Sequence, residues 1–296
     1  MFIDCHVHAL ETPTCVHPQT GKQLISTPEV LIERYDAVNI EKGVILPIAS
    51  SDSTYFTQSN EEVMRMAAKY PDRFIPFCNI DPRAMGNTGS APLVPILQYY
   101  KDLGCKGVGE VTANIDMDDE RVQNLFKCVN EVGMALTFHL ASRERYTYGL
   151  IEDIGLVKLE KALQKYPNIK FFGHSQVFWS EIAANPTPQE RGSYPKGIIT
   201  EEGAIQKLMR KYPNLYGDMS AGSGWNALAR DEEFAVKFLN EFQDRLMFGT
   251  DICAPEQADL CLRLVDLLNK FRAEKKISET VFQKVARENI IRILDL

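Results

Sequence analysis

The sequence has few histidines and tryptophans, no basic cluster and no long apolar run. Its 296 residues include five histidines and two tryptophans, and the net charge is −7. A nucleic-acid-binding protein normally presents a basic face, and no run of lysine and arginine here is long enough to form one. No apolar run approaches the ~18 residues of a membrane-spanning helix. We therefore expect a small-molecule partner rather than nucleic acid or a membrane.

The cysteines form no recognisable framework. There are seven, scattered along the chain, and none of them forms a Cys-x-x-Cys motif. In a chain of this size, such a set is typical of free thiols in a reducing compartment. The N-terminus lacks the basic start and apolar stretch of a secretory signal. These features predict a cytoplasmic protein, and they leave open whether it forms a homo-oligomer.

Short apolar runs alternate with longer helical patterns along the whole sequence. Eight candidate strands each precede a candidate helix, and such repeats produce parallel strands because each crossover returns the chain to the same end of the sheet. No Gly-x-Gly-x-x-Gly follows the first strand, so the main sign of a dinucleotide-binding fold is missing. We therefore predict a single-domain α/β protein, a (β/α)₈ TIM barrel over residues 1–296. The candidate strands are residues 2–7, 43–48, 74–80, 107–111, 135–140, 169–173, 215–217 and 246–249.

Candidate helices fill the intervals between these strands. A threonine followed by a proline at the first helical position starts the first of them. Two further helices close the chain after the last strand. The candidate helices are residues 27–39, 61–69, 92–103, 118–132, 155–165, 200–211, 231–242, 256–270 and 278–294.

Six potential metal ligands fall at the carboxyl ends of five candidate strands. Two of them form a His-x-His motif, whose side chains point to the same face of a strand. Because the strand ends of a barrel converge on one space, we expect these groups to lie within ~10 Å of one another. Imidazole and carboxylate are the ligands expected for Zn²⁺ or a similar ion. The six are His6, His8, Glu110, His139, His174 and Asp251.

With these motifs in place, the chain resembles the amidohydrolase superfamily. The resemblance covers the whole chain: the opening IDCHVH, the GVGE of the fourth strand, the histidines ending the fifth and sixth strands, and FGTD after the eighth. It is similar to the amidohydrolase-related branch, which holds hydrolases, lactonases and non-oxidative decarboxylases. The resemblance implies a barrel with one or two divalent metal ions at the carboxyl ends of the strands.

The resemblance also implies roles for the ligands. His6, His8 and Asp251 would bind the first metal. His139 would be a ligand whether the centre holds one ion or two. His174 would bind a second metal, or act as a polarising acid/base if only one ion binds. Many binuclear relatives bridge their metals with a carboxylated lysine on the fourth strand.

In this sequence Glu110 takes the place of that lysine. A glutamate can bridge two ions, but it can also stay outside a mononuclear site, so the number of ions stays open. Asp218 ends the seventh strand, and we expect it to orient a ligand histidine rather than to bind metal.

The ligand set favours hydrolysis of a small organic substrate, such as a lactone, amide or ester that carries a carboxylate. A divalent cation lowers the pKa of bound water from 15.7 towards ~7 and polarises a substrate carbonyl. Asp251 lies where it can accept the water's proton and pass it to the leaving group. The alternative is non-oxidative decarboxylation of an aromatic or unsaturated acid, which would release CO₂. A third interpretation is a metal-binding barrel without catalytic activity.

Four residues in the loops after the fifth, sixth and seventh strands are candidates for substrate contacts. Arg143 and Arg145 could hold a substrate carboxylate, since the guanidinium fork suits that geometry. They could equally belong to a solvated surface loop. Trp179 and Trp225 could wall the pocket or pack a long loop against the barrel.

We predict that the purified protein carries a divalent cation. Zinc is expected from the nitrogen and oxygen ligands, with manganese or iron also compatible. A chelator should abolish turnover, and returning the cation should restore it. Elemental analysis and activity assays before and after dialysis check this prediction, and full activity in thoroughly demetallated protein would contradict it.

Overall fold

The computed structural model describes residues 1–13, 16–54, 56–143 and 147–296. In these residues the chain alternates between strands and helices, and every pair of neighbouring strands is parallel. The strands are β1 (Phe2–Val7), β2 (Ile40–Ile45), β3 (Phe74–Pro76), β4 (Gly107–Val111), β5 (Ala135–Ala141), β6 (Leu150–Ile151), β7 (Lys170–His174), β8 (Leu215–Asp218) and β9 (Leu246–Met247).

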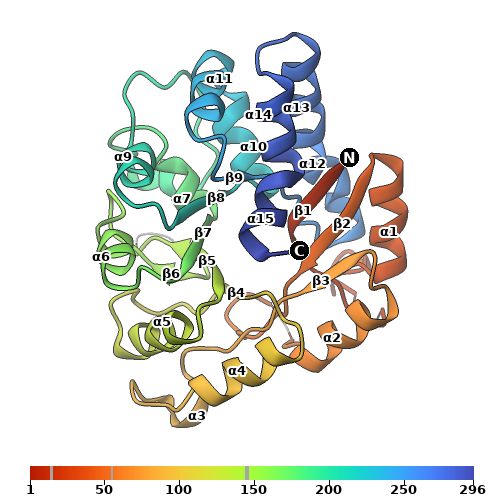
Figure 1. The fold of residues 1–296 in the computed structure, drawn as a ribbon, viewed down its shortest axis with the longest axis vertical. Coiled ribbons are helices and arrows are strands. Elements are labelled where there is room, and N and C mark those ends of the chain that lie inside the picture. Colours follow the sequence, from red (N-terminus) through yellow and green to blue (C-terminus); the bar gives the residue numbers. More distant parts are fainter. Residues whose placement is uncertain (14–15, 55, 144–146) are drawn as a thin grey trace.

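The strands lie in two hydrogen-bonded sheets that meet at both edges. One sheet has the order β1-β2-β3, the other β4-β5-β7-β8-β9, and the short β6 pairs with β5. Between β3 and β4, Cys78 N donates to Gly107 O at 3.0 Å and Gly109 N donates to Cys78 O at 2.9 Å. At the other seam, Cys5 N donates to Phe248 O at 2.9 Å. Eight strands therefore follow one another around a TIM barrel, as the sequence predicts, with helices outside them (Figure 1).

The predicted outer helices are present, most of them with ends that shift by a few residues. The predicted helix over residues 256–270 is instead divided, and its longest part begins only at Arg263. Helix α5 shows why the boundaries fall where they do. The Asp119 carboxylate caps its start by accepting from Arg121 N at 2.9 Å, and Gly133 ends it in the left-handed region with φ 69°. The outer helices are α1 (Pro28–Ala37), α2 (Asn60–Lys69), α4 (Val94–Asp102), α5 (Glu120–Val132), α6 (Val157–Lys165), α9 (Ala204–Lys211), α11 (Glu232–Glu241) and α13 (Arg263–Ala273).

Several short helices were not predicted, and all of them lie in connections that follow a strand. Most are too short to show a helical period, and α10 contains glycines and serine, which have low helix propensity. The sequence predicts one helix over residues 278–294, whereas a π-helical turn, η2, divides it. The remaining helices are α3 (Ala84–Asn87), α7 (Gln176–Ser180), α8 (Pro188–Arg191), α10 (Ala221–Ala229), η1 (Pro255–Gln257), α12 (Ala258–Cys261), α14 (Glu279–Gln283), η2 (Lys284–Glu288) and α15 (Asn289–Leu294).

The hydrophobic core has an inner and an outer layer. Inside the barrel, a buried cluster joins residues such as Ile3, Phe77 and Phe172 to Ile290 and Ile293 of α15, which closes the end of the barrel where the strands begin. The outer layer lies between the strands and the surrounding helices. The open, functional end of the barrel is therefore the opposite one, where the strands end.

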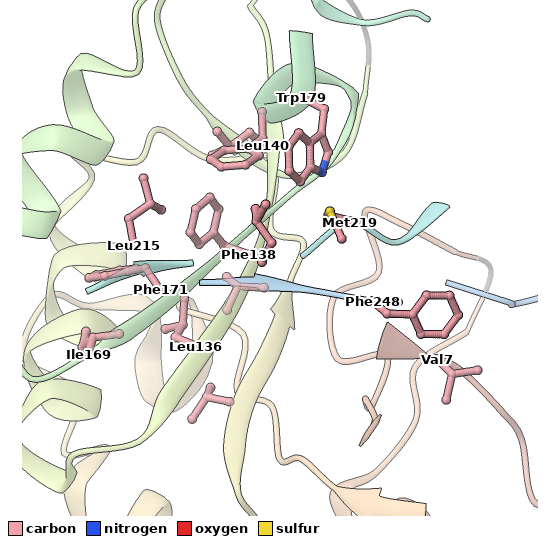
Figure 2. Close-up of a cluster of buried hydrophobic side chains, with 14 of the residues drawn as sticks. Val7, Leu136, Phe138, Leu140, Ile169, Phe171, Trp179, Leu215, Met219 and Phe248 are labelled. Carbon is pink, nitrogen blue, oxygen red and sulfur yellow. The ribbon is translucent and has the colours of Figure 1, made fainter. Parts of the chain in front are cut away.

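Strand alternation distributes the phenylalanines of β7 between these layers. Phe172 belongs to the inner cluster, whereas its neighbour Phe171 points outward and packs beside Phe138 (Figure 2). The ring of Phe171 lies 5.4 Å from that of Phe126 on α5 and 6.2 Å from that of Phe138, both edge-on. In the described part of the chain, no helix combines the length and apolar character that crossing a membrane requires.

Phe171→Ala should lower the free energy of unfolding by about 3–5 kcal/mol, because it leaves a cavity among fully buried rings. Urea denaturation followed by circular dichroism measures the change. Ile198→Ala is the control, since Ile198 is 75% exposed and its truncation should change stability by no more than about 0.5 kcal/mol. A loss below about 1 kcal/mol for Phe171→Ala would contradict this packing.

Candidate metal centre

The open end of the barrel brings together all six ligands that the sequence predicts. His6 lies in β1 with His8 just after it, and both are buried. Strands β5 and β7 pair in a register that places His139 directly opposite His174. Glu110 lies in β4, so three strands of one sheet supply neighbouring candidate ligands.

The distances between these groups suit a shared centre. His6 Nε2 lies 3.1 Å from His8 Nε2 and 3.6 Å from Asp251 Oδ1. Ligand atoms of Glu110, His139 and His174 also lie within 4.8 Å of one another. The expected convergence within ~10 Å is therefore confirmed.

Glu110 lies between two groups of histidines. Its Oε2 atom is 3.7 Å from His6 Nε2 and 3.5 Å from His8 Nε2, whereas its Oε1 atom is 3.7 Å from His174 Nε2. Asp251 is arranged in the same way, with Oδ1 3.7 Å from His8 Nε2 and Oδ2 3.7 Å from His174 Nε2. Each carboxylate therefore presents one oxygen to each side of the centre.

Hydrogen bonds behind the histidines aim their Nε2 atoms at the centre. His6 Nδ1 donates to Asp218 Oδ2 at 2.7 Å, as expected for Asp218, and His8 Nδ1 donates to Leu46 O at 2.9 Å. His174 Nδ1 hydrogen-bonds with Ser220 Oγ at 3.0 Å. Burial by itself would raise the pKa of Asp218, but the imidazoles of His6 and His174 hold it well below its usual range.

Asp4 is a supporting residue that the sequence analysis did not single out. Its buried carboxylate accepts hydrogen bonds from His6 N at 2.9 Å, Thr250 N at 2.9 Å and the Tyr35 hydroxyl at 2.6 Å. Burial raises the pKa of Asp4 to about 6 despite these donors. The signal that could have identified Asp4 is a carboxylate in the middle of a strand whose residues are all buried.

The segment after β9 has little freedom of conformation. A Cβ atom on Gly249 would lie 2.7 Å from Ser220 Cβ and 2.9 Å from Cys5 Sγ, so a larger residue does not fit there. Asp251 follows with φ 55°, in the left-handed region that aspartate tolerates better than most residues. Its amide donates to His6 O at 2.8 Å, and burial raises the pKa of its carboxyl to about 6.

Three of the four candidate substrate-binding residues contact the protein itself. The Arg143 guanidinium pairs with Asp116. Trp179 is buried, and its indole N–H donates to Asp218 O at 2.9 Å. The Trp225 ring lies 5.1 Å from the Arg263 guanidinium carbon. Arg145 lies outside the described residues. Substrate contact by these side chains stays a prediction.

A cavity of about 220 Å³ opens beside the centre, next to His8, Glu110 and Asp251. Its described lining contains no lysine or arginine. A second cavity, of about 460 Å³, borders His139 and shares Tyr148 with the first. Most of the lining of the first cavity comes from loop residues, which no pattern in the sequence identified as part of a pocket. These residues are Leu24, Ile25, Pro47, Ile48, Ser53, Thr54, Thr112, Tyr148 and Cys253.

The donor atoms of the centre fit a divalent cation. Glu110 Oε1 is buried and has no hydrogen-bond partner among the described residues. Leaving such groups unsatisfied is costly, and a cation between imidazole and carboxylate donors would relieve that cost. The chemistry of the donor set, nitrogen with carboxylate oxygen, is the one that zinc and similar ions take.

Comparisons with known proteins bear on the fold and the family of this chain. Comparison with curated proteins finds no match. Among solved structures, an uncharacterized TIM-barrel protein, Bb4693 from Bordetella bronchiseptica, is similar with a TM-score of 0.65 and 20% identity over 99% of this chain and 98% of that one.

Two further structures are similar at lower identity, which indicates the fold alone. One is 5-carboxyvanillate decarboxylase from Sphingomonas paucimobilis, with a TM-score of 0.61 and 13% identity over 100% of this chain and 99% of that one. The other is a probable 2-pyrone-4,6-dicarboxylic acid hydrolase from Acinetobacter baumannii, with a TM-score of 0.57 and 14% identity over 100% and 99%. A family model described as Amidohydrolase matches residues 3–296. The chain therefore belongs to the amidohydrolase family.

Proposed function

We propose that this chain is a metal-dependent hydrolase whose centre holds two divalent cations, with zinc expected. The observation that carries the proposal is the position of Glu110, which presents one oxygen to His6 and His8 and the other to His174. His6, His8 and Asp251 would hold one ion, and the second would lie beside the other histidines. Bound divalent cations polarise a carbonyl and lower the pKa of water.

Asp251 is the candidate general base. Both of its oxygens face the centre, and its side chain, which is 21% exposed, lines the first cavity. It can therefore accept a proton from water beside the substrate and return it to the leaving group. His174 is held through Nδ1 by Ser220, which leaves Nε2 for a cation or, with one ion, for the substrate.

The first cavity supports a small substrate with an apolar part. Leu24, Ile25 and Ile48 form an apolar wall, and Ser53, Thr54 and Tyr148 bring hydroxyl groups to it. We propose a lactone, amide or ester whose carbonyl lies beside Glu110 and Asp251. Any carboxylate on such a substrate would meet no cationic side chain in the described lining of this cavity.

That same absence supports a second candidate, non-oxidative decarboxylation. Because no described lysine or arginine lines the cavity, the cations of the proposed centre would be the groups best suited to bind a substrate carboxylate. A decarboxylase is also among the similar structures. Release of CO₂ from a panel of aromatic acids would favour decarboxylation, and ring opening of lactones would favour hydrolysis. Bound metal without turnover on either panel would favour a non-catalytic barrel.

Glu110→Gln should lower the metal content from about two ions per chain to about one, and turnover should fall with it. The amide keeps one acceptor oxygen, but it cannot present a charged oxygen to each side of the centre. Elemental analysis together with kcat checks this prediction. Glu201→Gln, at an exposed position, is the matched control and should change neither quantity. Unchanged metal content and rate would remove Glu110 from the centre.

Asp251→Asn should lower kcat by about 10² or more, the range usual for a general base, while bound metal and folding are largely kept. The amide keeps the shape and one ligating oxygen but loses basicity. Asp231→Asn provides the matched control. Asp231 caps α11 by accepting from Phe234 N at 3.1 Å, and asparagine caps about as well as aspartate. A near-normal kcat for Asp251→Asn would refute the catalytic role.

A further inference from the structure

A thiol lies beside the ligands of the candidate centre. Cys253 follows Asp251 by two residues, is half-buried and lines the first cavity together with His8 and Asp251. Its Sγ atom is 3.6 Å from Asp251 Oδ1. Ile252, between them, is fully buried in the outer core cluster, so the aspartate and the cysteine share the cavity side of the segment.

The thiol completes a group of three donors. Ligand atoms of His8, Asp251 and Cys253 all lie within 4.8 Å of one another. His8 Nδ1 is occupied by Leu46 O, so Nε2 is the ring nitrogen that it can offer. The Glu110 Oε2 atom lies 3.5 Å from His8 Nε2, so a further carboxylate oxygen stands beside this group.

We propose that Cys253 is an additional metal ligand, which with His8 and Asp251 forms an alternative, cavity-side position for a thiophilic divalent cation. As the sulfur–metal bond forms, the thiol proton leaves to solvent and the sulfur binds as thiolate. Because His8 has one free ring nitrogen, a cation cannot use it here and in the His6–His8 position simultaneously. The two positions are therefore alternatives.

The identity of the donors determines which cations take this position. Thiolate favours soft ions such as Cd²⁺ and also zinc, whereas carboxylate and water suit Mn²⁺ and Mg²⁺. A cation held by Cys253 would also lie on the side of the centre that faces the substrate cavity. The inference rests on the proposed metal centre, but it does not depend on which reaction the centre catalyses.

The test titrates metal-free protein with Cd²⁺ alone and records thiolate-to-cadmium charge-transfer absorption in the ultraviolet. Wild-type protein should develop this absorption in step with the first cadmium bound, and Cys253→Ser should lose it while still binding cadmium. Cys261→Ser is the matched control. Cys261 Sγ lies 3.7 Å from Asp251 O, behind the ligand, and Cys261 is not among the described residues that line the cavity. This variant should keep the absorption.

Competition between cadmium and manganese gives a second readout. Cys253→Ser should lower the preference for Cd²⁺ over Mn²⁺ by at least about tenfold, because the remaining donors are nitrogen and oxygen. Unchanged absorption and preference in Cys253→Ser would overturn the inference while leaving the centre intact. Failure of wild-type protein to bind cadmium would overturn both. If the wild-type protein shows the thiolate-to-cadmium charge-transfer band but hydrolyses none of the substrates, the inference is upheld and the proposed reaction is contradicted.

Discussion

The buried carboxylate of Asp4 joins the first strand to the segment after the last one. It accepts hydrogen bonds from the amides of His6 and Thr250, and so it fixes residues that are about 240 positions apart in the chain. The amide of Asp251 adds a further bond to His6 O. The seam at which the barrel closes is therefore also the place where the histidine pair meets Asp251, and closure of the fold and assembly of the centre depend on the same contacts.

The centre concentrates carboxylates whose described neighbours are imidazoles. Asp218, Glu110 and Asp251 are three carboxylates gathered around buried imidazoles, with no lysine or arginine among the described groups that contact them there. Burying charged groups is expensive even when they are paired. A cation that binds only the folded state would stabilise that state by an amount that grows with the logarithm of its concentration once this exceeds Kd, so folding and metal uptake would be thermodynamically linked.

Much of this architecture was predictable, because short segments of the sequence show the strand periodicity and the order of His-x-His, Glu, His, His and Asp. The barrel and the convergence of the six candidate ligands follow from parallel strands that end at one face. Asp4 was not predictable in this way. The β1–β2 register shifts between Asp4 and Val7, and Asp4 contacts Tyr35 outside the barrel although His6 faces the centre. The contacts of Arg143 and Cys253 were not predictable either, because loop conformation decides where their side chains lie. Arg143 forms an ion pair with Asp116, whereas Cys253 lines the first cavity.

Helix α15 gives the barrel a closed floor, with Ile290, Ile293 and Leu294 packed into the interior cluster. A molecule in the centre therefore has no path through the barrel axis. In the proposed function, reactant and product would therefore enter and leave on the side of the loops, where the two cavities lie. The loops that line these cavities, rather than the interior of the barrel, would then set the path by which a product leaves.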